Sequence, residues 1–515
     1  MPRQAFKPDA SFFQKIAIGA VGTRYVSNDL AKFGHNLVEL ERGSADTKIW
    51  KEVKRKRVRI PDLVCTRCGL RVESRAKTDN VLAMSHSPGE AERAWDYGMV
   101  GDDMVAFPVC QTTVEDYTSI GRLSMSSSYW RERRWLRWNE PHYINYFTVR
   151  AFRETLHDRT STKGVTEGTE TSIEWRALFA SRPGIVDCVS DSRIRICFDG
   201  GGSYTWGNKY QLPVVVAPGE HVEQGQVIAC AVQPIKGEEL TCSDSLGSDK
   251  LAGLIGSRRM TERFTGVKLV RLRRDSRFCS QISCLAADQD EDIYVRLESI
   301  AYLVSECGHD LRELLLPYLQ RSDPQLQLEA IITLAEIPIP AAILLLADIL
   351  STQDVPFFLR SAAAWSLGRS GTREAAGHLM SAFSDVSLAV RQEALAGVTA
   401  LGTGAIPVLL CGVSDANPDI AAGCAEALRQ LGHLPGDTIA RLVAGAISGD
   451  ERTWMTWLLG NIPRHYVVSE IARYEGSRPD LHYALSVLWS FLESWIACNW
   501  DIQIGADVPC VEIAP

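Results

Sequence analysis

The chain has 515 residues, 45% hydrophobic and 23% charged, a composition typical of a globular protein with several cores. The sequence holds no run of 18 apolar residues and its start lacks the apolar core of a signal peptide, so we predict a cytoplasmic chain with no membrane span and reduced thiols. Residues 1–160 carry a net charge of +6 and the remainder −14. A basic front favours contact with a polyanion such as DNA, although +6 also fits an ordinary solvated surface.

Charged groups are concentrated in residues 60–79, which we predict to form a β-hairpin. Its first strand carries Asp62 after a proline, and its second strand, RVESRAK, alternates charged with smaller residues. Side chains two residues apart share one face of a strand, so we expect Glu73, Arg75 and Lys77 to point the same way. The hairpin then presents two carboxylates beside two cations.

Pro-Asp on one strand and an acid on the next resemble the PD-(D/E)xK nuclease superfamily, over roughly residues 20–125. The resemblance implies that Asp62 and Glu73 hold Mg²⁺ or Mn²⁺, which activates water and neutralises phosphate charge. It also implies that Lys77, helped by Arg75, steadies the water and the phosphate. The sequence departs from the family in placing arginine two residues after the acid and lysine four residues after it.

Two further acids are candidates for the same metal site. Residues 27–42 fit an amphipathic helix that ends with Glu39 and Glu41, and either would complete the set of ligands. Arginine cannot give up its proton, so a site served by Arg75 alone would bind nucleic acid without cutting it. An unrelated charged hairpin is the third interpretation.

Cys65 and Cys68 form a Cys-x-x-Cys pair, which is half of a tetrahedral zinc site. His86 and Cys110, in the same predicted domain, are candidates for the other two ligands. A redox pair is less favoured because the thioredoxin type opens a helix and this pair lies in a hairpin turn. Two free thiols in a tight turn are the remaining alternative.

Residues 128–146 interleave aromatic residues with arginines. Arg131, Arg133, Arg134 and Arg137 are therefore candidates for contacts with nucleic-acid phosphates, beside aromatic rings that stack on bases. The tryptophans of this stretch recur at helical spacing, so an amphipathic helix with buried tryptophans is the alternative.

The middle of the chain predicts a small β module at residues 175–240. Its final hairpin, with Pro218-Gly219 and Gly225-Gln226, resembles that of a barrel-sandwich hybrid domain, as in biotinyl and lipoyl carriers. Lys236 lacks the neighbours that a carrier lysine has, so we expect a spacer or docking module with no prosthetic group. Residues 241–288 are predicted to be a basic linker, either lying on nucleic acid or solvated.

A repeat dominates the second half. Similar segments begin at spacings of 31, 33, 31 and 30 residues, starting at Val295, Leu326, Leu359, Val390 and Ile420. A regular period of this size indicates a solenoid. The Asp-x-x-x-x-Val-Arg motif ahead of an alanine-rich helix resembles a HEAT repeat of the short bacterial type, which implies an α-solenoid that binds a protein partner.

Arginines recur at one position of this repeat, at Arg296, Arg360 and Arg391. They predict either a ladder that binds phosphates or hydrogen bonds within the solenoid. We place the solenoid at residues 289–435 and a helical cap at 436–515.

The predicted fold class is therefore multidomain: an α/β domain resembling restriction endonucleases at residues 1–160, the small β module, the linker and the HEAT-like α-solenoid. The leading functional hypothesis is a metal-dependent nuclease acting on DNA, in defence or repair. The alternative is a non-catalytic scaffold whose front domain docks on nucleic acid. The two hypotheses differ in whether Mg²⁺ is needed, and the absence of a GxxxxGK[ST] motif argues against an ATP-driven role.

Overall fold

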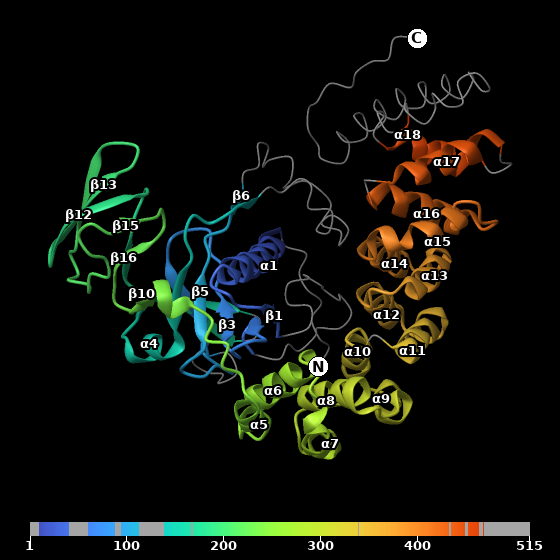
Figure 1. Ribbon diagram of the computed structural model, residues 1–515, viewed down its shortest axis with the longest axis horizontal. Coiled ribbons are helices and arrows are strands. Elements are labelled where there is room, and N and C mark those ends of the chain that lie inside the picture. The colour runs from blue at the N-terminus through green and yellow to red at the C-terminus, as the bar shows by residue number, and fades with distance from the viewer. Residues whose placement is uncertain are drawn as a thin grey trace, which may run out of the picture.

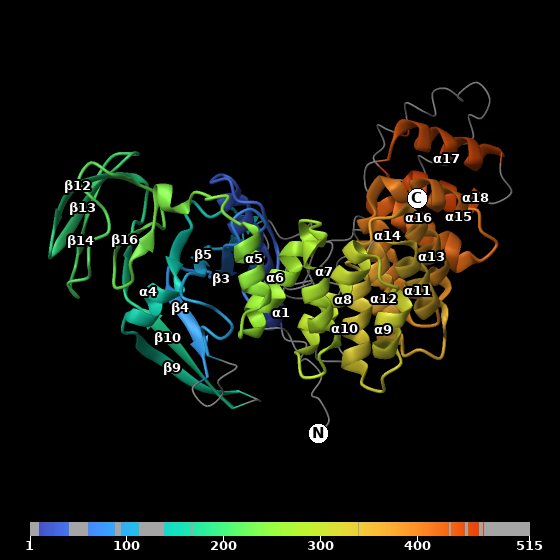
Figure 2. The same cartoon turned by 60° about the horizontal axis from the view of Figure 1, so that its bottom comes forward.

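Two kinds of architecture follow one another along the chain (Figures 1 and 2). An N-terminal region holds several β-sheets, and a helical HEAT-like solenoid follows it, as the predicted fold class required. The computed structural model describes residues 10–40, 60–87, 94–112, 138–165, 168–337, 339–431, 434–448, 452–462 and 467.

A six-stranded mixed sheet forms the centre of the N-terminal region, in the order β1-β2-β3-β5-β8-β17. Its strands are β1 (Leu37–Glu39), β2 (Leu63–Cys65), β3 (Arg71–Ser74), β5 (Met104–Phe107), β8 (Asn145–Thr148) and β17 (Pro234–Ile235). The first three form an antiparallel meander, β5 runs parallel to β3, and the last two are antiparallel again. Because β17 belongs to this sheet, the sheet extends past the domain boundary that we predicted at residue 160.

Helix α1 (Ala10–Ala31) covers one face of this sheet, where Val26 and Leu30 pack against strand residues such as Val72. Gly22 allows the close approach, because a Cβ there would lie 2.5 Å from the Cβ of Ala76. The prediction of a helix through residue 42 was wrong. The helix ends before a turn at Gly34, whose φ of +83° suits glycine, and the apolar residues that follow pair as β1.

The other face of the sheet is covered by helix α4 (Val149–Glu154) and a three-stranded sheet in the order β4-β10-β9. These strands are β4 (Leu82–His86), β10 (Gly168–Trp175) and β9 (Asp158–Val165). Phe107 and Phe147 from the central sheet meet Phe152 of α4 and Trp175 of β10, with Phe152 and Trp175 ring centroids 4.7 Å apart. Strands β6 (Gln111–Thr112) and β7 (Trp138–Asn139) form a separate pair.

A small β module lies at the end of the molecule away from the solenoid (Figures 1 and 2). It has a four-stranded sheet, β14-β13-β12-β15, beside the pair β11-β16. The strands are β11 (Ala177–Phe179), β12 (Gly184–Ser190), β13 (Arg193–Phe198), β14 (Ser203–Gly207), β15 (His221–Val222) and β16 (Val227–Cys230). The strands expected at GIVDCV, RIRICF and SYTW form β12, β13 and β14, whereas the strand expected at YQLPVVV is reduced to an isolated bridge between Val214 and Ala229.

The segment 241–288, which we predicted as a linker, is helical instead. After the 3-10 turn η2 (Gly237–Leu240) it forms α5 (Ser248–Ile255), α6 (Met260–Leu272), the turn η3 (Ser276–Phe278) and α7 (Cys279–Ala287). Part of the positive charge of this segment is buried in ion pairs. Arg271 is 7% exposed and lies 2.7 Å from Glu298 and 2.6 Å from Glu336.

A disulfide joins Cys279 to Cys307, which corrects the expectation that every thiol is reduced. It ties α7 to the first long helix of the solenoid, α8 (Ile293–Cys307).

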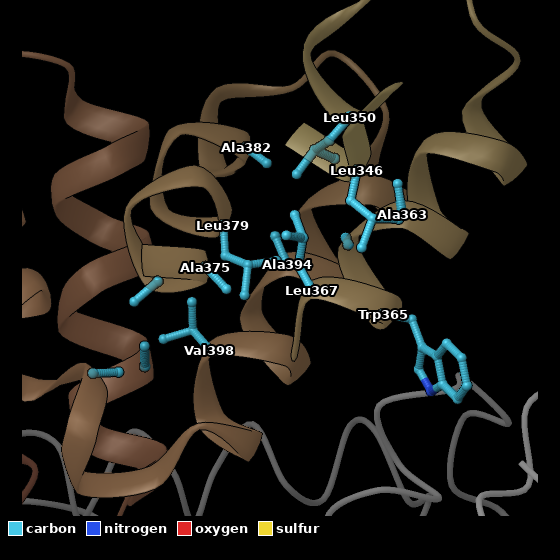
Figure 3. Close-up of a cluster of buried hydrophobic side chains, with 14 of the residues drawn as sticks. Leu346, Leu350, Ala363, Trp365, Leu367, Ala375, Leu379, Ala382, Ala394 and Val398 are labelled. Atoms are coloured by element: carbon cyan, nitrogen blue, oxygen red, sulfur yellow. The ribbon is translucent and has the colours of Figure 1, made fainter. Parts of the chain in front are cut away.

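The solenoid stacks short helices in pairs from α8 to the end of the described chain. They are α9 (Leu311–Leu319), α10 (Pro324–Leu334), α11 (Pro340–Ser351), α12 (Phe357–Arg369), α13 (Arg373–Ser381), η4 (Ala382–Ser384), α14 (Leu388–Ala400), η5 (Gly402–Ala405), α15 (Ile406–Gly412), α16 (Pro418–Leu431), α17 (Gly436–Ser448) and α18 (Arg452–Gly460). Leucine and alanine side chains from successive repeats form one continuous core, part of which Figure 3 shows. Most of the predicted cap lies outside the described residues, although α17 and α18 begin it.

Close helix packing and internal ion pairs stabilise the solenoid. A Cβ on Gly368 of α12 would lie 2.4 Å from the Cα of Gly397 on α14, so only glycine permits this contact. Arg360 and Asp385 form a buried ion pair at 2.9 Å, and Arg360 also donates to the carbonyl of Val355. This member of the arginine series therefore bonds within the solenoid.

Within the described residues, no single helix is long and apolar enough to cross a membrane. The segments Leu388–Ala400 and Gly402–Gly412 reach that length only when taken together, and they bend by 113° at their junction.

Candidate functional sites

The predicted acidic hairpin is formed by β2 and β3. Leu63 pairs with Val72, so continuing the antiparallel register by one residue sets Asp62 opposite Glu73. Directly opposed residues of a sheet share a face, which puts the two carboxylates on the same side. Asp62 Oδ2 accepts a hydrogen bond from the amide of Ser74 at 2.8 Å. This bond fixes the first acid against the strand that carries the second.

The two cations that follow β3, Arg75 and Lys77, lie on the same side as Glu73. Gly22 of α1 approaches Ser74 and Ala76, so the alternating residues Glu73, Arg75 and Lys77 face away from α1. Arg75 Nη2 lies 3.1 Å from Glu73 Oε1 and donates to the carbonyl of Trp95 at 3.0 Å. A metal ion held by Glu73 would therefore share it with Arg75.

Lys77 extends this row past the end of β3. Its amide donates to the carbonyl of Pro108 at 3.0 Å, and its carbonyl accepts from the amide of Cys110 at 2.7 Å. Burial, and secondly the Arg75 guanidinium, lower the pKa of Lys77 to about 8. An amine with such a pKa exists in both protonation states near neutral pH.

The other acids proposed for the metal are not brought to this face. Glu39 pairs with Leu63, which pairs in turn with Val72, and both of these apolar side chains pack toward α1. The register therefore sets Glu39 on the face opposite to Asp62 and Glu73. Glu41 lies outside the described residues, as do Arg131, Arg133, Arg134 and Arg137.

A second cluster, which we call the Cys3His cluster, consists of His35, Cys65, Cys68 and Cys242. Their ligand atoms all lie within 4.8 Å of one another, and the three residues from the N-terminal region are buried. The sulfurs of Cys65 and Cys242 are 3.9 Å apart, and Cys68 Sγ is 3.6 Å from His35 Nδ1. A buried set of three thiols and one imidazole could hold a structural metal ion such as Zn²⁺.

Hydrogen bonds orient the members of this cluster. The Nε2 of His35 lies 2.9 Å from the carbonyl oxygen of Leu240, so Nε2 carries the proton and Nδ1 presents its lone pair to the sulfurs. A hydrogen bond from Cys68 lowers the pKa of Cys65. The same bond, together with burial, raises the pKa of Cys68.

His86 and Cys110, the ligands we proposed from the sequence, lie elsewhere. His86 belongs to β4, where it pairs with Thr171. Cys110 is fully buried against Ile18 and Val21 of α1, where burial raises the pKa of its thiol to about 12. The structure sets His35 and Cys242 beside the cysteine pair in their place.

Sequence spacing alone gives little signal for His35 or Cys242. His35 follows a helix without a second ligand nearby, and Cys242 is 174 residues after Cys68 and beyond the predicted domain boundary. Only the folded chain brings them together, since the amide of Cys242 donates to the carbonyl of Phe33 at 2.9 Å.

Comparisons with known proteins identify the second half only. A family model described as HEAT repeats matches residues 283–368 and 312–397. No curated protein matches the chain. HEAT-type solenoids typically offer extended surfaces to protein partners.

Several solved structures resemble part of the chain. Human deoxyhypusine hydroxylase in complex with glycerol is 15% identical and covers 44% of this chain and 99% of its own, with a TM-score of 0.20. An engineered protein is 14% identical, over 50% of this chain and 78% of its own, with a TM-score of 0.23. The complex of CpcE and CpcF of phycocyanin lyase from Nostoc sp. is 16% identical, over 48% and 95%, with a TM-score of 0.18. At these TM-scores the likenesses carry no argument about function.

Proposed function

We propose that the protein is a metal-dependent nuclease acting on DNA, with its solenoid holding a protein partner. The observation that carries the proposal is the shared face of Asp62 and Glu73, with Lys77 following Glu73 on it. The antiparallel meander of β1, β2 and β3, which sets Asp62 opposite Glu73, supports the proposal.

The donor set fits a hard cation, since carboxylate oxygens are the ligands that Mg²⁺ and Mn²⁺ prefer. When bound, such an ion lowers the pKa of a bound water and offsets charge on the phosphate. Asp62 and Glu73, which lie opposite each other in the continued register of β2 and β3, would hold the ion. Lys77 in its neutral form accepts a proton, and in its charged form it stabilises the phosphate, while Arg75 adds a fixed positive charge.

The test is cleavage of labelled duplex and single-stranded DNA and RNA with Mg²⁺ or Mn²⁺. The proposal expects cleavage by the wild type to fall at least a hundredfold in Glu73→Gln, because a neutral amide binds the cation poorly. Asp79→Asn is the matched control, since Asp79 is an exposed carboxylate on the same segment that accepts a hydrogen bond from the neighbouring Thr78 hydroxyl. Cleavage that persists in Glu73→Gln would contradict the assignment.

A non-catalytic scaffold is the second candidate, favoured by the Arg75–Glu73 ion pair that occupies one of the proposed ligands. A scaffold binds nucleic acid without Mg²⁺ and binds equally well after Glu73→Gln. Binding of this kind, with no cleavage by the wild type, would replace the first proposal by the second.

We also propose that the Cys3His cluster holds a structural Zn²⁺ ion. Thiolate and imidazole ligands select zinc over the hard cation proposed for the carboxylates, so the two sites take different metals. Four protein ligands leave no open position, which suits a structural ion and not a catalytic one.

A further inference from the structure

We infer that Zn²⁺ in the Cys3His cluster acts as a joint between the central sheet and the helices that lead into the solenoid. The inference rests on the zinc proposed above and adds what the ion does. His35 follows α1, Cys65 ends β2, and Cys68 lies in the turn between β2 and β3. Cys242 begins the segment that runs from the sheet into α5, so one ion would cross-link both parts.

Two of the six separations among the four ligand atoms match those around a tetrahedral ion, and all six are within 4.8 Å. Bond lengths of about 2.3 Å to sulfur and about 2.0 Å to nitrogen imply about 3.8 Å between two sulfurs and about 3.5 Å between sulfur and nitrogen. The Cys65 and Cys242 sulfurs are 3.9 Å apart, and Cys68 Sγ is 3.6 Å from His35 Nδ1. These pairs therefore need almost no movement to bind the ion.

Direct contacts surround the cluster on the solenoid side. Arg67, within the Cys-x-x-Cys turn, pairs with Asp244 at 2.9 Å and accepts at its carbonyl a hydrogen bond from the amide of Leu246. Lys250 of α5 donates to the carbonyl of Cys68 at 2.8 Å. The turn that carries two ligands is thus bonded to three residues just after Cys242.

A shared apolar core continues from this point. Val64, next to Cys65, packs in one cluster with Leu246, Val267 of α6 and Tyr302 of α8. Lys268, 3% exposed, donates to the carbonyl of Leu40, the residue after β1. The sheet and the first solenoid helices therefore share one core. The ion would bind at the edge of that core, where Cys242 joins the two parts.

The first experiment measures metal content of the full-length protein by mass spectrometry and zinc release with a colorimetric chelator. We expect about one Zn²⁺ per chain in the wild type and in Cys411→Ser, whose thiol is exposed on α15. Cys242→Ser should release zinc at least tenfold faster. A wild type without zinc would overturn both the zinc site and the joint. Unchanged release from Cys242→Ser would remove Cys242 from the ligands and so overturn the joint.

The second experiment measures hydrogen exchange in the zinc-bound and chelator-treated wild type, which needs no variant to fold. The amides of Cys242 and Leu246 bond to Phe33 and Arg67 across the joint. We expect their peptides to exchange at least fivefold faster without zinc, while α16, far along the solenoid, is unchanged. Equal exchange with and without zinc would overturn the joint and leave the zinc site and the nuclease proposal standing.

Discussion

Replacement of Lys77 by methionine should stabilise the protein while abolishing the proposed activity. The side chain is largely buried, and burial lowers the pKa of its amine from 10.5 to about 8. At about 1.4 kcal/mol per pKa unit, holding the ammonium charged in the folded state costs about 3 kcal/mol. Methionine keeps the aliphatic length without the charge. The backbone bonds to Pro108 and Cys110 do not involve the side chain and should survive the change.

The expected gain depends on pH in a defined direction. Below pH 8 the amine is protonated in both the folded and unfolded states, so wild type bears the full penalty. Between pH 8 and 10.5 the unfolded chain binds more protons than the folded one, and the stability of the wild type rises with pH. The advantage of Lys77→Met, about 1 to 3 kcal/mol at pH 7, should therefore shrink as the pH approaches 10.

Guanidinium unfolding followed by tryptophan fluorescence measures this difference, because Trp95 and Trp175 lie in the core beside the central sheet. Lys209→Met is the matched control, since Lys209 is exposed and its replacement should change stability by less than about 0.5 kcal/mol. A Lys77→Met protein that is less stable than wild type, or a difference that does not vary between pH 7 and 10, would refute the argument that the ammonium is desolvated.

Two further predictions test packing and charge by thermal and denaturant unfolding. Gly22→Ala should destabilise the protein by about 1 to 3 kcal/mol, because the new Cβ would lie 2.5 Å from Ala76 Cβ. The control is Gly19→Ala on the same helix, which meets no atom within 4 Å and should be neutral or stabilising. Equal effects of the two changes would contradict the close packing at Gly22. Arg360→Ala should lower the free energy of unfolding by about 3 to 5 kcal/mol, because it leaves the buried Asp385 carboxylate without its cation. The double change Arg360→Met with Asp385→Leu should recover most of that stability. No recovery would show that the destabilisation does not come from the unpaired charge.

The sequence predicted those elements whose signal is local. Alternation predicted a strand in RVESRAK, of which Arg71–Ser74 forms β3, and a strand in RIRICF, which forms β13. The period of 30 to 33 residues predicted the solenoid, which the HEAT family model confirms. In both cases each element buries one face, so its own pattern carries the information. The shared face of Glu73, Arg75 and Lys77 follows from the same alternation.

The sequence failed where contacts join distant segments. The basic residues of 241–288 suggested a solvated linker, yet Arg271 is buried with Glu298 and Glu336, which come from a later helix and loop. The linker interpretation ignored that a buried cation needs a distant anion. The zinc ligands were missed for the same reason, since His35 and Cys242 are close to Cys65 only through the tertiary fold.

The β2–β3 hairpin connects the two proposed metal sites. Side chains along a strand alternate, so a slip of one residue in the pairing of Leu63 with Val72 would move Glu73 to the α1 face and away from Asp62. Cys65 and Cys68 lie at the turn end of this same hairpin, and a zinc ion bound to both would hold the turn and so the register of the two strands. The candidate catalytic acids therefore depend on the register that the structural metal would hold. The chain that leads into the solenoid helices also supports this turn, because Leu246 and Lys250 donate hydrogen bonds to the carbonyls of Arg67 and Cys68.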